Sequence, residues 1–206
     1  HLPQLRERVR GLHVGSYSLV VTPVADTLFE LVGRECERRL ISLDPNVRLN
    51  VEPDIQLWRR RIEAFAAHAH LIKVSEEDLS LLYPDQDPQA VAKRWLGQRC
   101  QLLCLTHGGD GASVHSRVHG HWSVPARAVQ TRDTVGAGDT FQAALLTWMA
   151  EHAALSADAL AALSRPALGE ALSFAARAAA STAASMSAAL PRAIWASTRS
   201  CSSVQW

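Results

Sequence analysis

Residues 133–139 read DTVGAGD and lead directly into an apolar helical pattern that runs to about residue 151. The small residues Gly136, Ala137 and Gly138 let the backbone pass close to a ligand at the point where the helix is expected to begin. The first N–H groups of a helix have no partner within it, and the helix dipole places positive charge at the same end. We therefore expect an anion-binding turn, which suits the charge that develops on a transferring phosphoryl group.

Asp139 follows this turn and admits two interpretations. Its carboxylate could accept a proton from a hydroxyl group that attacks phosphorus, which would make it a general base. It could instead only cap the helix from residue 139 to residue 151, with the two glycines serving a tight turn. The spacing of the residues alone leaves these two interpretations evenly balanced.

Outward from this turn, the chain alternates short apolar runs with helical patterns. The apolar runs have the length of strands and are bounded by turn-forming residues, whereas the segments between them repeat with the period of a helix. The expected strands cover residues 12–15, 40–44, 71–74 and 102–108, and a hairpin covers residues 113–118 and 121–125. The expected helices begin near residues 22, 53, 75, 87, 139 and 167.

Alternating strands and helices predict an α/β fold, with a mostly parallel sheet flanked by helices on both faces. In such a sheet, ligands bind beyond the carboxyl ends of the strands. Asp44, Lys73, Thr106 and the 133–139 loop all lie at or just beyond these ends, so the sequence predicts one site there. The Ala-rich helix over residues 167–185 suits close packing against the sheet.

The composition excludes several classes of protein. The chain has 206 residues, of which 48% are hydrophobic and 20% are charged, as in an ordinary globular domain. A net charge of +1 argues against a nucleic-acid partner, and no apolar run reaches the roughly 20 residues that span a bilayer. The first residues lack the apolar segment of a signal peptide. We expect a cytoplasmic protein with no membrane partner, whose four cysteines are reduced.

The D-T-V-G-A-G-D segment, followed by T-F, resembles the C-terminal signature of the ribokinase family of carbohydrate kinases, also called the phosphofructokinase B family. The resemblance implies a ribokinase-like fold and transfer of the γ-phosphate of ATP, with Mg²⁺, to a sugar hydroxyl. It implies that Asp139 is the catalytic base and that Gly136, Ala137 and Gly138 form the anion hole. It also implies that Asp133 contributes to a site for a monovalent cation such as K⁺.

Two further segments, one rich in glycine and one that ends in a glutamate, resemble other motifs of the family. Residues 105–111 resemble its T-x-G-x-x-G turn along the nucleotide, which carries over Thr106, Gly108 and Gly111. Residues 73–76 resemble its N-x-x-E motif, in which Glu76 matches the residue that organises magnesium and its waters. Without the resemblance, the first segment is an ordinary turn after a strand, and Glu76 is a first-turn residue stabilised by the helix dipole.

Lys73 stands where many family members have asparagine, and the resemblance implies that it contributes to nucleotide binding. A motif that begins with lysine is associated with fructokinase-like members. Residues 44–48, DPNVR, also resemble a fructokinase-like segment. There Asn46 and Arg48 would line the cleft near the phosphates, a task that suits the fork of an arginine. On its own, this segment is a turn after a strand.

The resemblance covers about residues 10–190, which correspond to roughly the C-terminal two-thirds of a family member. The N-terminal strands, the β lid and the sugar-gripping Asp of the family are therefore expected to be absent from the sequence as given. We expect residues 1–191 to form an incomplete ribokinase-like α/β domain that carries the ATP and anion-hole site, and residues 192–206 remain unassigned. Ser187 departs from the family's usual glycine, near the adenine wall.

The function expected from these residues is that of an ATP-dependent sugar kinase with fructose as the acceptor. Another small acceptor, such as ribose, 2-keto-3-deoxygluconate or a nucleoside, stays open within the same family. A truncated, non-catalytic nucleotide-binding relative is the alternative from a different class. Many family members pair through the lid, so a homodimer is expected of the intact protein only.

Overall fold

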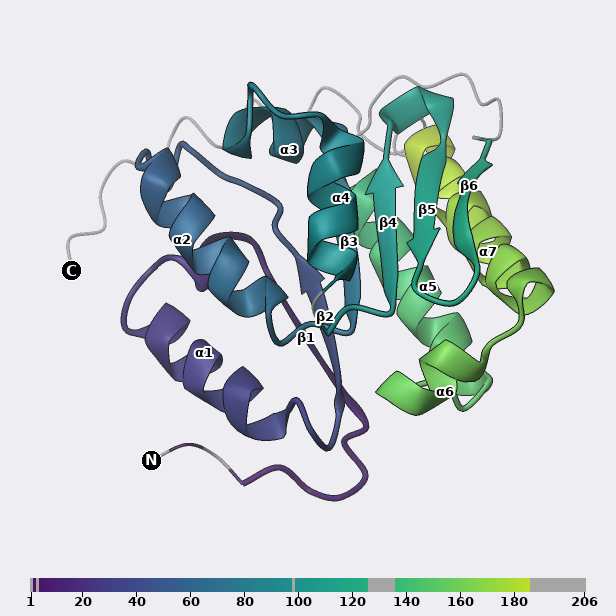
Figure 1. Cartoon of the computed structure of the whole chain (residues 1–206), viewed down its shortest axis with the longest axis horizontal. Coiled ribbons are helices and arrows are strands. Elements are labelled where there is room, and N and C mark those ends of the chain that lie inside the picture. The colour runs from purple at the N-terminus through teal and green to yellow at the C-terminus, as the bar shows by residue number, and fades with distance from the viewer. Residues whose placement is uncertain (1, 3, 98, 126–135, 186–206) are drawn as a thin grey trace, which may run out of the picture.

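A computed structural model describes residues 2, 4–97, 99–125 and 136–185 of the chain (Figure 1). These residues contain one six-stranded sheet with the strand order β1-β2-β3-β4-β5-β6. The first four strands run parallel to one another, and the last two form an antiparallel hairpin beside β4. The strands are β1 (Gly11–Gly15), β2 (Leu40–Asp44), β3 (Leu71–Ser75), β4 (Leu102–Thr106), β5 (Ala112–Ser116) and β6 (Gly120–Val124).

The helices cover both faces of the sheet, which confirms the predicted α/β fold (Figure 1). Parallel neighbours in sequence order require right-handed crossovers, so the connecting helices fall on one face. That face carries α1 (Val24–Glu35), α2 (Ile55–Ala66), α3 (Glu76–Leu82) and α4 (Pro88–Leu96). The other face carries α5 (Ala137–Glu151), α6 (Ala157–Ala162) and α7 (Arg165–Ser185). Two 3₁₀ turns, η1 (Ser16–Leu19) and η2 (Gly108–Asp110), follow β1 and β4.

Two hydrophobic cores lie on the two faces because side chains alternate along each strand. Ile72 and Leu103 face the core beneath α1, α2 and α4. Leu71 and Cys104 face the core beneath α5 and α7. The central strands β2, β3 and β4 are buried on both faces, which explains why they read as nearly continuous apolar runs rather than as alternating ones.

Side-chain capping marks three of the helix starts. Asp54, Ser75 and Asp87 each accept a hydrogen bond from a backbone N–H of the helix that follows. Helix α1 starts without such a bond, because Pro23 is its N-cap residue and no side chain caps this helix.

One element of the C-terminal half was not expected. Helix α6 could not be foreseen, because its six residues are too few to show a helical period. The Ala-rich α7 packs closely against α5, and its residues Leu168, Ala171 and Leu172 share a core with residues of the sheet, as its composition predicted.

The described part of the chain contains no helix long and apolar enough to cross a membrane. Cys36, Cys100 and Cys104 are buried and free, and burial raises the pKa of the Cys100 and Cys104 thiols to about 12. Cys201 lies outside the described residues.

The close approach of β1 to β2 depends on a residue without a side chain. Gly15 pairs with Asp44, and a Cβ atom built on Gly15 would lie 2.4 Å from the Asp44 carbonyl oxygen. No heavy atoms tolerate that separation, and a backbone oxygen cannot move aside as a flexible side chain can. Gly15 therefore sets the distance between the two strands beside the end of β2 that carries Asp44.

Replacing Gly15 with alanine should push β1 away from β2 and lower the free energy of unfolding by about 1–3 kcal/mol, the usual cost of overpacking. The matched control is Gly169→Ala in α7, where an added Cβ meets no atom within 4 Å. That change should stabilise the helix by about 0.5–1 kcal/mol. Urea unfolding of both variants checks this pair of effects, and equal shifts of the two midpoints would contradict it.

His70 joins three strands as a buried neutral imidazole. The ring Nδ1 of His70 accepts the backbone N–H of Ile41 at 3.0 Å. The backbone N–H of His70 donates to the Ile41 carbonyl at 2.9 Å, and its backbone carbonyl accepts the Gln101 N–H at 2.8 Å. Burial, with a smaller contribution from the charge of Arg99, lowers the pKa of His70 from 6.5 to about 4. Protonation would place a hydrogen on the nitrogen that now accepts a bond.

Because the folded pKa of His70 lies below the unfolded one, its contribution to stability is complete above about pH 6.5. It is lost as the pH falls toward 4, since the unfolded chain takes up the proton first. His70→Gln, which does not titrate in this range, should lose less stability between pH 7 and pH 4.5 than the wild type. Urea midpoints measured across that range test this, and parallel profiles would refute it.

Candidate active site

A cavity of about 940 Å³ lies at the carboxyl ends of the parallel strands. Its walls come from the segment after β2, the β3–α3 junction, the β4–η2 turn and the start of α5. Every predicted site residue other than Asp133 lines it: Asn46, Arg48, Lys73, Glu76, Thr106, Gly108, Gly111, Gly136, Ala137, Gly138 and Asp139. Asp133 lies outside the described residues, as does Ser187.

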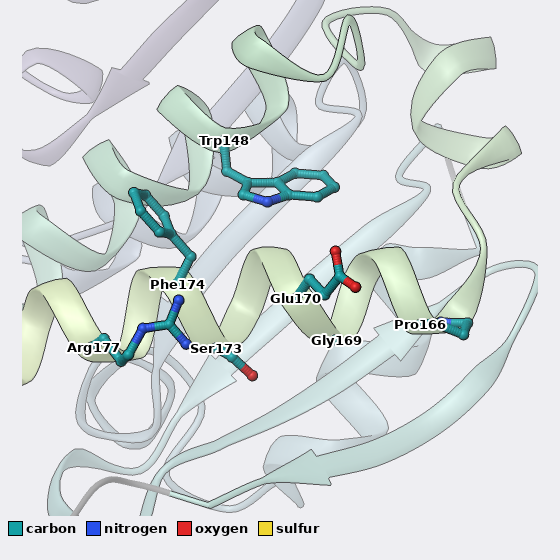
Figure 2. A pocket seen from close by; sticks show the side chains of 7 residues that line it. All are labelled: Trp148, Pro166, Gly169, Glu170, Ser173, Phe174 and Arg177. Carbon is teal, nitrogen blue, oxygen red and sulfur yellow. The ribbon is translucent and has the colours of Figure 1, made fainter.

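A second hollow of about 600 Å³ has no connection with the strand ends (Figure 2). Its lining comes from α5 and α7 alone, with Trp148 and Phe174 on one side and the charged side chains of Glu170 and Arg177 nearby. None of the predicted site residues lies there. The described residues that the sequence singled out therefore gather at the larger cavity.

The start of α5 has the backbone geometry of an anion-binding turn. Gly136 is its N-cap residue and has φ = +78°, in the left-handed region that glycine adopts without strain. The first helical bond runs from the Thr140 N–H to the Gly136 carbonyl at 2.9 Å. The N–H groups of the residues between them precede that first bond, so they are available to an anion in the cavity. Asp139 lies in this first turn with an exposed side chain.

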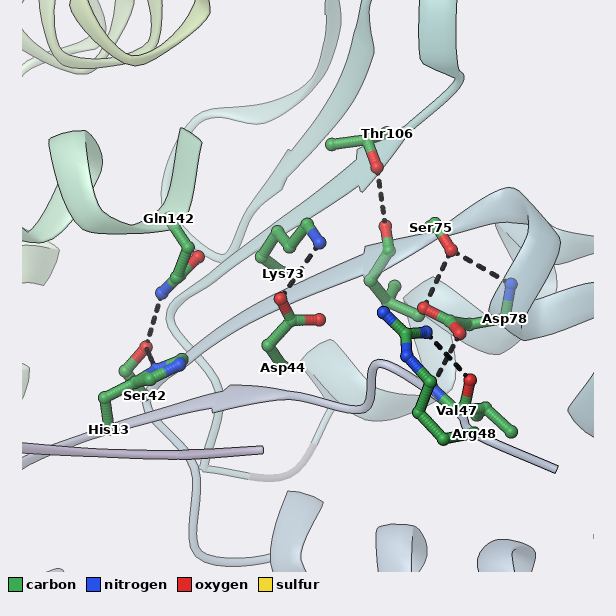
Figure 3. Close-up of polar contacts among 11 residues, drawn as sticks. His13, Ser42, Asp44, Val47, Arg48, Lys73, Ser75, Asp78, Thr106 and Gln142 are labelled. Atoms are coloured by element: carbon green, nitrogen blue, oxygen red, sulfur yellow. Dashed lines mark hydrogen bonds and ion pairs between the residues drawn. The ribbon is translucent and has the colours of Figure 1, made fainter. Parts of the chain in front are cut away.

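A buried ion pair, drawn in Figure 3, lies close to Gly138 of this turn. Lys73 Nζ donates to Asp44 Oδ2 at 2.9 Å, and both side chains are buried. The ideal Cβ position of Gly138 is only 2.9 Å from Lys73 Nζ, so the ammonium group fills the space that a side chain at 138 would need. Burial raises the pKa of Asp44 above its usual value to about 6, and the charge of Lys73 and its hydrogen bond oppose this shift.

The segment after β2 is held against α3 by another buried carboxylate (Figure 3). Asp78 accepts the Val47 N–H at 2.8 Å and the Ser75 hydroxyl at 2.7 Å, while Ser75 Oγ caps the helix by accepting the Asp78 N–H at 3.0 Å. Asn46 adopts a left-handed conformation with φ = +41°, which asparagine tolerates better than most residues. Arg48 is exposed at the cavity wall, where its guanidinium is accessible to an anion.

Glu76 is connected to the turn after β4 through a histidine. His107 Nδ1 lies 2.9 Å from Glu76 Oε2, and its Nε2 lies 2.7 Å from Ser113 Oγ. A carboxylate only accepts, so Nδ1 is the donor and Nε2 can accept from the Ser113 hydroxyl. The described residues contain no cluster of three or more metal-ligating side chains. An exposed carboxylate such as that of Glu76 fits Mg²⁺, which keeps several waters and is held by one or two carboxylates plus phosphates.

A polar chain ties α5 to the sheet one turn beyond Asp139 (Figure 3). Gln142 is buried, and its Nε2 donates to Ser42 Oγ at 2.6 Å. Ser42 Oγ in turn lies 3.1 Å from His13 Nδ1. This chain fixes the start of α5, and hence Asp139, relative to β1 and β2.

Asp44, Asp78 and Gln142 are part of this site although no sequence motif gave them a role there. Asp78 had a visible signal, because S-x-x-D at residues 75–78 is a helix-capping pattern. Gln142 gave only the weak signal of one polar residue within an apolar helix. Asp44 stood at a strand end, but nothing in the sequence indicates that it pairs with Lys73, 29 positions later.

The fold and the glycine turn together define a ribokinase-like α/β protein. The family described as "pfkB family carbohydrate kinase" matches residues 4–194, and the chain belongs to that family.

Several characterised proteins are similar to the chain. It is 39% identical over 145 residues to a fructokinase of Rhizobium leguminosarum bv. trifolii, an alignment that covers 70% of this chain and 44% of that protein. The structure of Xylella fastidiosa fructokinase with bound ATP superposes with a TM-score of 0.76 at 26% identity, covering 84% of this chain and 55% of that one. Aminoimidazole riboside kinase of Salmonella enterica gives 0.74 at 25% identity, covering 94% and 62%. The chain spans about half the length of the curated relatives it matches.

Replacing Asp78 with alanine should release the segment after β2, because the Val47 N–H would lose its acceptor. We expect the free energy of unfolding to fall by about 1–3 kcal/mol, the cost of leaving a buried donor unsatisfied. Glu77→Ala is the matched control, since Glu77 is exposed in the same helical turn. It should change stability by less than about 0.5 kcal/mol. Chemical unfolding distinguishes the two variants. Similar losses of stability in both would contradict the role of Asp78 in holding the segment after β2.

Proposed function

We propose that this chain carries the nucleotide and phosphoryl-transfer site of an ATP-dependent sugar kinase that phosphorylates a hydroxyl group of fructose. One observation carries the proposal: the glycine turn at the start of α5 and the Lys73 ammonium face the same cavity, with Asp139 in that turn. Backbone N–H groups and a cation at one point suit a phosphoryl group in transfer. A carboxylate beside them suits deprotonation of the attacking hydroxyl.

In this mechanism the residues divide into three tasks. Asp139 takes the proton from the acceptor hydroxyl, while Gly136, Ala137 and Gly138 stabilise charge on the γ-phosphate through their N–H groups. Glu76, held by His107, would orient Mg²⁺ through its waters, and that ion when bound would neutralise phosphate charge. The nucleotide would contact Asn46, Arg48, Lys73, Thr106, Gly108 and Gly111.

The same proposal includes a site for a monovalent cation such as K⁺, to which Asp133 would contribute a ligand. The fructose assignment rests on the fructokinase relatives and on the K-V-S-E and D-P-N-V-R segments. A nucleoside-like acceptor is the second candidate, favoured by the similarity to aminoimidazole riboside kinase over 94% of the chain. A panel of fructose, ribose, 2-keto-3-deoxygluconate and nucleosides separates these acceptors.

Asp139→Asn should lower the rate of phosphoryl transfer by about 10²–10⁴-fold, the usual contribution of a general base, and leave ATP affinity nearly unchanged. The matched control is Asp158→Asn, an exposed carboxylate in the first turn of α6, which should keep full activity. Sugar phosphate formation and ATP binding are measured on the same purified protein.

Full activity of Asp139→Asn would remove the base assignment. Failure of the wild-type protein to phosphorylate any member of the panel, despite binding ATP, would instead favour a non-catalytic nucleotide-binding protein.

A further inference from the structure

Lys73 is an unusual group to find against an anion-binding turn, because its side chain is almost completely buried. An ammonium has three N–H donors. One of them is used by Asp44 Oδ2, and no other partner of Nζ occurs among the described residues. Since Lys73 also lines the cavity, the remaining donors are available to a ligand there.

The carboxylate that holds this ammonium is itself fixed by the sheet. Ser42 pairs with Leu71 and Leu43 with Ile72, so the next residues along, Asp44 and Lys73, lie side by side. On the opposite side, Gly15 pairs with Asp44 at a distance that excludes any Cβ. Asp44 is thus held between two parallel neighbours, with its side chain on the face covered by α5 (Figure 3).

One oxygen of the Asp44 carboxylate has no partner in the described part of the chain. Asp44 Oδ1 is buried and makes no hydrogen bond there, so the only described partner of this side chain is Lys73. A buried carboxylate that contributes only to folding would normally satisfy both oxygens. The arrangement therefore incurs a desolvation cost, and its visible result is the position of one ammonium group.

Building on the proposed function, we propose that Asp44 is a positioning residue that fixes the Lys73 ammonium against Gly138, so that Lys73 acts on the terminal phosphate of the nucleotide. Gly138 belongs to the same arrangement, because the Lys73 ammonium lies where a side chain at residue 138 would otherwise be. The N–H groups of the turn then approach the phosphate from one side and Lys73 approaches it from the sheet.

The position of Lys73 depends on Asp44 because of the length of the lysine side chain. Its flexible four-carbon stem lets the ammonium leave the position beside Gly138 when it has no partner. Loss of Asp44 should therefore remove the effect of Lys73 even though the lysine is still present.

The terminal phosphate distinguishes this role from a general effect on the site. Under the proposed function, the turn at 136–138 holds the phosphoryl group in transfer, which ATP carries and ADP lacks. Lys73 lies against that turn, so it should contribute to binding of the triphosphate and little to binding of the diphosphate. The ratio of the two affinities is a readout that mere loosening of the fold would not change.

The experiment is a double-mutant cycle on the whole chain with Asp44→Asn, Lys73→Met and the two combined. Isothermal titration gives the dissociation constants of ADP and of AMP-PNP, a triphosphate analogue that resists transfer, both with Mg²⁺. Lys73→Met should weaken AMP-PNP binding by about 10–100-fold, as expected for a bond to a charged group, and ADP binding by less than about threefold. Asp44→Asn should act in the same direction, and the combined variant should lose no more than Lys73→Met alone.

Asp87→Asn is the matched control, because it makes the same chemical change at the N-cap of α4, outside the cavity lining. Asparagine caps a helix as well as aspartate does, so both affinities should stay at the wild-type value. If Asp44→Asn does not fold, Asp44→Leu combined with Lys73→Met removes both charges, a change that buried ion pairs tolerate. This double variant should show the same ratio of AMP-PNP affinity to ADP affinity as Lys73→Met alone.

The outcomes separate this inference from the function on which it rests. A wild-type chain that binds neither nucleotide overturns the proposed function and this inference with it. A wild-type chain that binds both, with an Asp44→Asn variant of unchanged or higher AMP-PNP affinity, overturns the inference alone. Losses that are additive in the combined variant, or equal for the two nucleotides, also overturn it.

Discussion

The register of the parallel strands is the constraint on which the site depends. Because β2 and β3 are paired so that Asp44 and Lys73 lie side by side, a carboxylate and an ammonium meet on the face covered by α5. A shift of one residue would turn one of these side chains to the opposite face, among the apolar residues beneath α2 and α4. The apolar residues before them set that register, since Ile72 and Leu71 must reach different cores. The hydrophobic pattern of the strands therefore also determines where the charges lie.

Helix α5 brings the second half of the site to the same place, and it is held there by polar as well as apolar contacts. Leu145 and Met149 pack into the core shared with α7, while Gln142 reaches the sheet at Ser42. The apolar contacts place the helix over the sheet, and a hydrogen bond of 2.6 Å fixes its position along the strands. Since Gln142 lies less than one turn after Asp139, this bond lies close to the residue that the proposed mechanism uses.

The sequence predicted the fold well because its signals were local. Each strand is an apolar run that ends at turn formers, and Asp54, Ser75 and Asp87 mark helix starts by ordinary capping chemistry. The same local signals located the carboxyl ends of the strands, where the described motif residues line one cavity. What the sequence could not supply were the pairs between distant residues, such as Asp44 with Lys73 and Gln142 with Ser42. Such pairs depend on register and helix placement, which a single sequence does not encode in any short pattern.

The proposed anion site combines two kinds of positive charge that impose different demands on the protein. The N–H groups at the start of α5 carry partial charges that folding supplies without a counterion. Lys73 carries a full charge, and burying it is tolerable only because Asp44 is buried beside it. The carboxylate weakens the field that an anion would feel, yet without it the ammonium could leave its position beside Gly138. A glycine at 138 reconciles these demands, because it lets the charged group approach the backbone N–H groups closely enough for both to act on one anion.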